Sequence, residues 1–327
     1  NNEGETAREL VDMAEGKVFE IAEQGLRGGR EGAVSIQTLM PMLIDQIDEW
    51  HANPGGLRGL PTGFDEFDKK TGGLRPGDLV IVAGRPSMGK TTLAVNMAEY
   101  AALKSDVKGS VVIFSMEMPS EQLMTRMLSS VGRVSLGHIR SGQISDEDWP
   151  RITGAAGQLS EARIFIDETP ALNPTELRAR ARRVKREHGL NLVVVDYLQL
   201  MQVPGNKENR ATEISAISRG LKALAKELAV PVIALSQLNR GVEQRTDKKP
   251  VMSDLRESGA IEQDADMILL IYREEVYDKN TPKKGMAEID LAKHRNGETG
   301  TFVLSFQGQY SRFVNYAPES YAEGVLR

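Results

Sequence analysis

The chain has 327 residues, of which 40% are hydrophobic and 27% charged, and its formal net charge is −5. This length suits one large α/β domain with additional elements, and the acidic balance excludes a surface coated in positive charge, so any contact with nucleic acid must be local. The chain has no cysteine, which excludes disulfides and thiol catalysis, and no stretch near the ~20 apolar residues of a membrane span, so we expect a cytoplasmic protein with no membrane partner.

Residues 1–30 form the first predicted unit. Apolar residues recur at helical spacing over residues 3–25, and the glycine-rich sequence GLRGGREG follows at residues 25–32. The first pattern predicts a helix and the second a flexible linker. Because a single amphipathic helix has little to pack against, we expect it to be the last helix of a truncated N-terminal domain.

Residues 31–58 are predicted to form a linker that contains one amphipathic helix, over residues 39–51. Pro41 would interrupt a helix that begins at Ser35, so we expect Thr38 to be its N-cap and Pro41 to lie in its first turn. An apolar helix face between two flexible segments needs a partner surface, which is either its own domain or a neighbouring subunit. The apolar face consists of Met40, Leu43, Ile44, Ile47 and Trp50.

Residues 59–327 are predicted to form one α/β domain. Short apolar runs alternate with helical segments, as in a mostly parallel sheet with helices on both faces. The stretch from Ala287 to Phe313 instead alternates apolar and polar residues and contains turn sequences at Asn296-Gly297 and at residues 307–309, which predicts a C-terminal antiparallel extension. The predicted strands are Leu79–Val82, Val111–Phe114, Ile164–Ile166, Leu192–Val195, Val232–Leu235, Met267–Ile271 and Ala287–Leu291.

The basic sequence RARARRVKREH, at Arg178–His188, is predicted to lie in a helix that Asn173 caps and Pro174 begins. Its basic residues could bind phosphates. Charge runs of this kind are usually solvated helix faces, however, and that is the interpretation we favour.

The sequence LVIVAGRPSMGKTT, at residues 79–92, holds the strongest functional motif. An apolar strand leads into a loop that fits G-x-x-x-x-G-K-[ST] from Gly84 to Thr91, and a helical pattern follows. In such a loop the backbone N–H groups and the helix N-terminus face phosphate groups. Gly84 and Gly89 allow close approach of the backbone, Lys90 reaches the β- and γ-phosphates, and the Thr91 hydroxyl binds Mg²⁺. The motif therefore predicts a nucleotide-hydrolysing site.

Hydrolysis needs further polar groups, and several predicted strand ends supply candidates. Asp196 ends one apolar run, where a carboxylate can help to hold Mg²⁺ through water. Glu117 follows another strand and can act as general base on the attacking water. Gln237 and Asn239 close a third, where a neutral amide can bond a γ-phosphate. Each of these residues also has a structural alternative, as a polar residue at a strand end or a helix start.

Lys293 and Arg295 lie far along the chain, in the sequence KHRNGETG. An arginine suits transition-state charge, because its planar guanidinium stays protonated. By itself this pair indicates nothing specific.

Six motifs, in chain order, resemble those of bacterial replicative DNA helicases of the DnaB type. They are GRPSMGKTT, FSMEMPSEQ, VVVDYLQLM, ALSQLNR, SDLRESGAIEQDAD and KHRNGETG. The resemblance covers residues 55–315, and the linker helix before it also fits. It implies a RecA-like P-loop NTPase fold, ATP and Mg²⁺ as ligands and a homo-hexamer as the assembly.

The resemblance also implies a role for individual residues. Asp196 resembles the Mg²⁺-associated aspartate, Glu117 the catalytic base and Gln237 the γ-phosphate sensor. Arg126 matches an arginine near the nucleotide base. The expected nucleotide contacts in the phosphate loop are Ser87, Met88, Gly89, Lys90, Thr91 and Thr92.

Lys293 and Arg295 resemble basic fingers that one subunit supplies in trans to the ATP of the adjoining subunit. His294, which lies between them, joins the expected nucleotide contacts. This resemblance implies that hydrolysis depends on the assembled ring.

Arg256, Glu257 and Gly259 match a segment that contacts the phosphates of single-stranded DNA. Residues 204–256 carry several basic residues and no Trp, Tyr or Phe. Without a stacking platform, DNA binding should be directed at the backbone, tolerant of sequence and sensitive to salt. Any one of the basic residues is more often a solvated surface charge. They are Lys207, Arg210, Arg240, Arg245, Lys248, Lys249 and Arg256.

The resemblance implies an ATP-dependent helicase motor that translocates on single-stranded DNA as a ring and unwinds duplex DNA at the replication fork. Primase and a helicase loader are the expected partners of the full-length protein. Two alternatives share the phosphate loop: a RecA-like recombination ATPase, which forms filaments, and a non-motor scaffold that uses ATP only for assembly. Glu117 and Arg295 argue against the scaffold, which needs neither a base nor a finger.

Overall fold

The computed structural model describes residues 34–53, 55–104, 109–202, 210–255 and 259–317. The chain divides into two units, Asn1–Gly56 and Leu57–Arg327. The helix predicted over residues 3–25 and the glycine-rich linker after it lie outside the described residues. Within the described ranges, no helix combines the length and the apolar composition that crossing a bilayer requires.

In the first unit, the described element is helix α2, Ile36–Ala52. Its N-cap is Ser35, whose hydroxyl accepts a hydrogen bond from the Gln37 N–H at 3.2 Å. The expected start at Thr38 was therefore wrong. Pro41 is tolerated inside α2 because none of the helix is buried, so water can bond the carbonyl group that the missing proline N–H leaves free. That the exposed apolar face of α2 packs on its own domain or on a neighbouring subunit stays a prediction.

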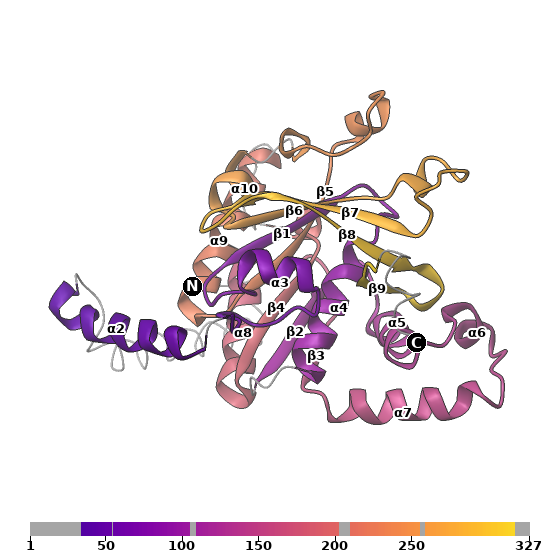
Figure 1. Ribbon diagram of the computed structural model, residues 1–327, viewed down its shortest axis with the longest axis horizontal. Helices are drawn as coiled ribbons and strands as arrows, with labels where there is room; N and C mark the ends of the chain where they lie inside the picture. Colours follow the sequence, from indigo (N-terminus) through magenta and orange to yellow (C-terminus); the bar gives the residue numbers. More distant parts are fainter. Residues whose placement is uncertain (1–33, 54, 105–108, 203–209, 256–258, 318–327) are drawn as a thin grey trace, which may run out of the picture. The chain divides into compact units, whose positions relative to one another are not determined.

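The second unit is built on a nine-stranded sheet with the order β3-β2-β4-β5-β1-β6-β7-β8-β9. Strands β1 to β6 run parallel, and β7, β8 and β9 continue the sheet from β6 as an antiparallel extension (Figure 1). Each strand predicted from the sequence is present, and the antiparallel extension is confirmed. The strands are β1 Leu79–Gly84, β2 Ser110–Ser115, β3 Ile164–Asp167, β4 Leu190–Asp196, β5 Val232–Gln237, β6 Met267–Tyr272, β7 Met286–His294, β8 Gly300–Gln307 and β9 Arg312–Asn315.

Helices cover both faces of the parallel strands, which is why β1 is buried along its whole length. Side chains alternate between the faces: Val80 packs in one cluster with Leu93 of α4, and Ile81 packs in the other with Leu221 of α9. The helices are α3 Asp65–Thr71, α4 Lys90–Leu103, α5 Ser120–Gly132, α6 Leu136–Ser141, α7 Asp148–Glu161, α8 Pro174–His188, α9 Arg210–Leu228 and α10 Gly259–Asp264, with 3₁₀ turns η1 Leu198–Leu200, η2 Arg240–Gln244, η3 Met252–Asp254, η4 Glu274–Val276 and η5 Gly308–Tyr310.

The basic helix α8 begins as predicted, with a capping box between Asn173 and Glu176 and with Pro174 in its first turn. Its arginines pair with carboxylates of neighbouring elements: Arg180 contacts Asp167 at 2.7 Å, and others contact Glu227 of α9. These pairs tie α8 to the rest of the second unit, so part of the expected solvated face has a structural use.

Asp266 lies where β6 begins, and its carboxylate anchors the edge at which the parallel strands start. It accepts a hydrogen bond from the Leu79 N–H at 2.8 Å and pairs with Lys222 of α9. Both charged groups of this pair are largely removed from water. A buried pair of this kind tolerates the loss of one member poorly.

We expect Asp266→Ala to lower the free energy of unfolding by about 3–5 kcal/mol, because Lys222 loses its buried counter-charge. Urea unfolding followed by circular dichroism measures the change. The control is Glu298→Ala, at an exposed turn, for which we expect less than about 0.5 kcal/mol. Equal effects of the two substitutions would contradict the anchoring role of Asp266.

Candidate nucleotide site

The phosphate loop joins the carboxyl end of β1 to the first residue of α4. Two of its residues have left-handed backbone conformations, Ser87 with φ of 67° and Gly89 with φ of 96°. A Cβ atom on Gly89 would lie 2.9 Å from the Phe313 ring, so only glycine fits there. This geometry turns the backbone N–H groups at the start of α4 toward the pocket, where they can bind phosphate.

Lys90 extends from the first turn of α4 into the pocket, where its Nζ donates a hydrogen bond to the Arg85 carbonyl at 3.2 Å. Burial lowers the pKa of Lys90, while the nearby carboxylates of Asp196 and Glu117 raise it. The ammonium group therefore lies in a partly desolvated position, where its attraction to a phosphate is stronger than in water.

Thr91 and Asp196 form a direct contact between α4 and the end of β4. The Thr91 hydroxyl donates to Asp196 Oδ2 at 2.9 Å, and Asp196 is 3% exposed. Burial raises the pKa of Asp196 to about 6, and the repulsion from Glu117 adds to this, whereas Thr91, Lys90 and Arg126 lower it. A hydroxyl and a carboxylate side by side are the hard oxygen donors that Mg²⁺ prefers.

No group of three or more His, Cys, Asp and Glu side chains that could hold a metal ion occurs in the described part of the chain. Mg²⁺ keeps several water ligands and is bound by one or two protein groups together with substrate phosphates. Thr91 and Asp196 are the residues that would hold it.

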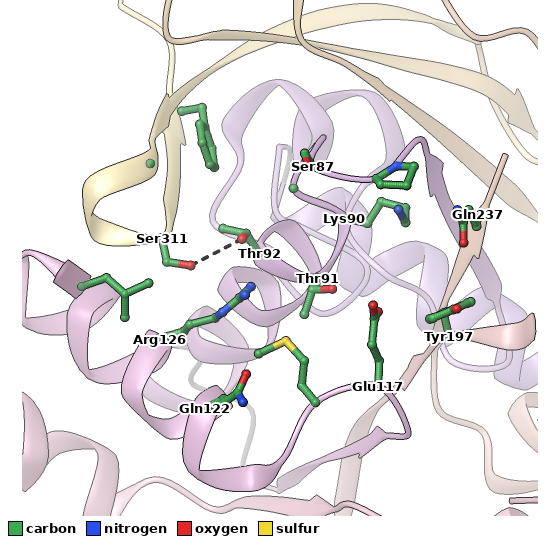
Figure 2. Close-up of a pocket in the computed structure, with 16 residues that line it drawn as sticks. Ser87, Lys90, Thr91, Thr92, Glu117, Gln122, Arg126, Tyr197, Gln237 and Ser311 are labelled. Atoms are coloured by element: carbon green, nitrogen blue, oxygen red, sulfur yellow. Dashed lines mark hydrogen bonds between the residues drawn. The ribbon is translucent and has the colours of Figure 1, made fainter. Parts of the chain in front are cut away.

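A pocket of about 650 Å³ opens beside the phosphate loop (Figure 2). This volume is within the usual range for a small-molecule site. Glu117, which follows β2, and Gln237, which ends β5, face its interior from strands that β4 separates, and Arg126 reaches into it from α5. The lining residues are Pro86, Ser87, Gly89, Lys90, Thr91, Thr92, Glu117, Met118, Gln122, Arg126, Leu136, Tyr197, Gln237, Phe306, Gly308 and Ser311.

Most of the residues predicted to contact the nucleotide or to act on it come together in this pocket. Met88 is the exception within the phosphate loop, because its side chain is 1% exposed and packs in the core. Only its backbone can serve a phosphate. Asn239 does not face the pocket as a second amide, since its side chain caps η2 by accepting from the Gly241 N–H at 3.0 Å.

Arg126 points into the pocket, and its Nε is buried without a hydrogen-bond partner in the described ranges. Burial lowers the pKa of Arg126, with a further contribution from Arg140, while Asp196 and Glu117 raise it. A partly buried guanidinium whose Nε has no partner among the described residues is a group that an anionic or polar ligand would satisfy.

The predicted fingers do not join the pocket of their own chain. Because β7 runs antiparallel to β6, its last residues pair with the first residues of β6, at the sheet edge opposite the phosphate loop. A strand of this length spans ~20 Å. Lys293 donates to the Ala265 carbonyl at 2.6 Å, and His294 Nδ1 lies 3.3 Å from the Glu298 carbonyl oxygen. Arg295 contacts Asp266 at 3.3 Å, with its side chain 51% exposed.

Arg256 and Glu257, predicted to contact DNA, lie outside the described residues, and Gly259 is the exposed first residue of α10. Several basic residues of the predicted DNA segment have partners within the chain. Arg245 pairs with Asp254 at 2.8 Å, and Lys249 pairs with Glu288. Fewer basic side chains of this segment are therefore available to bind DNA than its composition indicates.

Sequence reasoning missed Gln199, which bonds the backbone of Gln237 at the end of β5. Its Nε2 donates to the Ser236 hydroxyl at 3.0 Å and to the Gln237 carbonyl at 3.3 Å, and its Oε1 accepts from the Gln237 N–H at 3.2 Å. Its position three residues after Asp196 was the available indication. Arg273 was also missed: it donates to the Ser87 carbonyl at 2.9 Å across 186 residues of chain, which no local pattern could reveal.

A parallel sheet with a phosphate loop at the carboxyl end of its β1 strand, and with a carboxylate at the same edge, defines a RecA-like P-loop ATPase. Residues 59–315 match the family model of the DnaB-like helicase C-terminal domain. The chain belongs to this family, and it is the motor part of a replicative DNA helicase.

Curated relatives extend the match to nearly the whole chain. The replicative DNA helicase DnaB of Pasteurella multocida is 54% identical over 321 residues, which are 97% of this chain and 68% of the relative. That of Buchnera aphidicola subsp. Schizaphis graminum is 52% identical over 324 residues, covering 98% and 69%. The replicative DNA helicase DnaC of Bacillus subtilis is 48% identical over 308 residues, covering 94% and 67%.

Two solved structures share the fold. One, described as an ATPase domain, aligns with a TM-score of 0.81 at 37% identity and covers 88% of this chain and all of that one. A DnaB-like replicative helicase, described with its interactions with primase, aligns with a TM-score of 0.79 at 38% identity and covers 92% of this chain and 71% of that one.

We expect Gln199→Ala to lower the ATP turnover number by about tenfold or more while nucleotide affinity changes little, because Gln237 loses the brace that orients it. Steady-state kinetics and equilibrium binding separate the two effects. Gln202→Ala, at an exposed position nearby, is the matched control and should behave as wild type. If Gln199 acts through Gln237, the effects of Gln199→Ala and Gln237→Ala will not add in the double variant. Full additivity would rule this out.

Proposed function

We propose that this motor hydrolyses ATP in a ring of identical subunits, translocates on single-stranded DNA and displaces the complementary strand at the replication fork. The main support for a ring is that the residues needed for hydrolysis lie at two opposite edges of the sheet. The pocket has a phosphate loop and a candidate base, while Arg295 lies at the opposite edge, where a second copy of the chain can receive it.

Each pocket residue has a separate role in phosphoryl transfer. Lys90 and the loop N–H groups bind the β- and γ-phosphates, and Glu117 accepts the proton of the attacking water. Mg²⁺, when bound, supplies charge neutralisation at the phosphate oxygens, and Thr91 and Asp196 hold it, the latter through water. Gln237 bonds the γ-phosphate and transmits its loss to the segment that follows β5.

Arg295 completes the pocket of the adjoining subunit, where its guanidinium neutralises transition-state charge. Its contact with Asp266 does not prevent this. Asp266 also pairs with Lys222 and accepts from the Leu79 N–H, so it keeps a counter-charge when Arg295 leaves. Lys293 is less free to move, because its ammonium bonds carbonyl groups at the end of α10.

The DNA contact that we propose involves Arg256, Glu257 and Gly259, in the segment that connects β5 to α10. Because Gln237 ends β5, the same segment begins at the ATP pocket and ends at the proposed DNA contact. Absence of aromatic residues from 204–256 favours contacts to the DNA backbone. Loss of the γ-phosphate would then move the DNA contact.

The comparisons support part of the partner prediction. One solved relative is described with its interactions with primase, which supports primase as a partner of the full-length protein. A helicase loader, a hexameric assembly and a cytoplasmic location stay predictions. Family membership favours the helicase over the two alternatives, a recombination ATPase and a scaffold.

We expect Arg295→Ala to lower DNA-stimulated ATP hydrolysis by about 10³-fold while nucleotide binding stays nearly intact, because the finger acts only in the transition state. Glu117→Ala should be equally inactive. Mixing the two variants should restore part of the activity, at interfaces where an intact Glu117 meets an intact Arg295. The control is each variant assayed alone at the same total protein concentration. No recovery in the mixture would count against a finger in trans.

The test of the ring is ATP turnover measured across protein concentration, with and without single-stranded DNA, together with sizing of the nucleotide-bound protein. Turnover per subunit should rise steeply as a hexamer-sized species appears. Turnover that is the same at every concentration in a monomeric protein would contradict a shared site.

A further inference from the structure

Glu99 is a buried carboxyl group in α4, the helix that follows the phosphate loop, and it is 5% exposed. Its Oε2 accepts hydrogen bonds from the Ser130 hydroxyl of α5 at 2.7 Å and from the Asn96 amide at 3.1 Å. Its Oε1 is buried and has no hydrogen-bond partner in the described ranges. None of these residues takes part in the chemistry proposed for the pocket.

The hydrogen bonds continue from Asn96 and Ser130 to the β8–β9 corner, residues 306–313. Asn96 Oδ1 accepts from the Phe313 N–H at 2.8 Å, and its Nδ2 donates to the Ser311 carbonyl at 3.5 Å. Arg312 donates to the Ser130 carbonyl at 2.8 Å. One buried network therefore ties α4 and α5 to the β8–β9 corner.

The β8–β9 corner forms one wall of the nucleotide pocket, to which it contributes Phe306, Gly308 and Ser311. The Ser311 and Thr92 hydroxyl oxygens lie 3.4 Å apart (Figure 2). The same corner packs on the phosphate loop, since Phe313 occupies the space that a Cβ on Gly89 would need. A displacement of the corner therefore changes the shape of the pocket.

The charge state of Glu99 decides how well this network is satisfied. Burial raises the pKa of Glu99 to about 7, although the bonds from Ser130 and Asn96 and the charge of Arg312 lower it. Arg312 is the charged group that faces the carboxyl from β9, and the charge of Arg133 also acts on Arg312. Asn96 and Ser130, from α4 and α5, face it as neutral groups.

We propose that Glu99 is a positioning residue for the nucleotide, because the network from Glu99 through Asn96 and Ser130 holds the β8–β9 corner in place as a wall of the pocket. This inference rests on the proposed function of that pocket. While Glu99 is neutral, the network is intact. Ionisation keeps the bonds from Ser130 and Asn96 to Oε2, but it places a share of the negative charge on Oε1, which has no donor among the described residues. That charge draws Arg312 toward the carboxylate and away from the Ser130 carbonyl, which loosens the corner.

The test compares the full chain with its Glu99→Gln variant, which keeps the shape of the side chain and cannot ionise. The dissociation constant of a non-hydrolysable ATP analogue is measured from pH 6 to pH 8.5, together with KM and kcat for ATP. For wild type we expect affinity to fall about threefold to tenfold more than for Glu99→Gln over this range, with kcat at saturating ATP changed by less than about twofold. Asp196 and the nucleotide titrate in both proteins, so the ratio of the two affinities isolates Glu99.

Asp68→Asn is the matched control, since Asp68 is a buried carboxyl of α3 whose pKa is also raised by burial and whose bonds go to Thr62 and Gly63. It should change stability and leave the pH profile of nucleotide affinity as in wild type. Glu99→Ala breaks the network at every pH and should weaken nucleotide binding by about tenfold at pH 6. If this variant does not fold, the pH profile of Glu99→Gln still tests the inference.

Parallel pH profiles for wild type and Glu99→Gln would overturn the inference, as would a loss of stability in either Glu99 variant with unchanged nucleotide affinity. A wild-type chain that binds no nucleotide at any pH would instead overturn the proposed function, and this inference with it.

Discussion

Parallel strands bring their carboxyl ends to one edge of a sheet, and the nucleotide pocket depends on this constraint. The phosphate loop follows β1, Glu117 follows β2, and Asp196 and Gln237 end β4 and β5. These positions are separated by up to 153 residues along the chain, from Gly84 to Gln237, yet the register pairs these two residues directly. The hydrogen bond from Thr91 to Asp196 joins the helix after β1 to the end of β4, so the position of the proposed Mg²⁺ ligands follows from the strand order.

The reversal of direction at β7 has the opposite effect, because it brings the last residues of β7 to the edge where the parallel strands begin. Arg295 is held there by Asp266, a residue that the sheet already needs for Leu79 and Lys222. A single chain therefore separates its candidate finger from its own pocket by the length of the strands. On the proposed function, this separation makes hydrolysis depend on a neighbour and couples chemistry to assembly, with no additional regulatory element.

The sequence predicted the strands, the phosphate loop and the pocket residues that follow strand ends, because these features are local: an apolar run, a glycine pattern, a polar residue after a strand. It did not predict contacts between distant segments. Arg273 reaches Ser87, and Gln199 reaches Gln237, only once the sheet has formed. The start of α2 was predicted wrongly for a different reason: the general rule against an internal proline outweighed the cap at Ser35, and exposure of the helix relaxes that rule. Met88 shows that a motif position does not fix where a side chain points.

Helix α4 connects the phosphate loop to the interior of the domain. It has phosphate-binding groups at its N-terminus and a buried polar network along its length. Lys90 and Thr91 lie in its first turn, and Asn96 and Glu99 follow one to two turns later, facing α5 and the β8–β9 corner. The phosphate loop and the β8–β9 corner are therefore both connected to this one helix. A buried carboxyl whose second oxygen has no partner in the described part of the chain contributes little to stability, because a leucine or a glutamine could fill the space at lower cost in desolvation. Its presence is explained if the position of the corner matters more to this chain than the stability of its core.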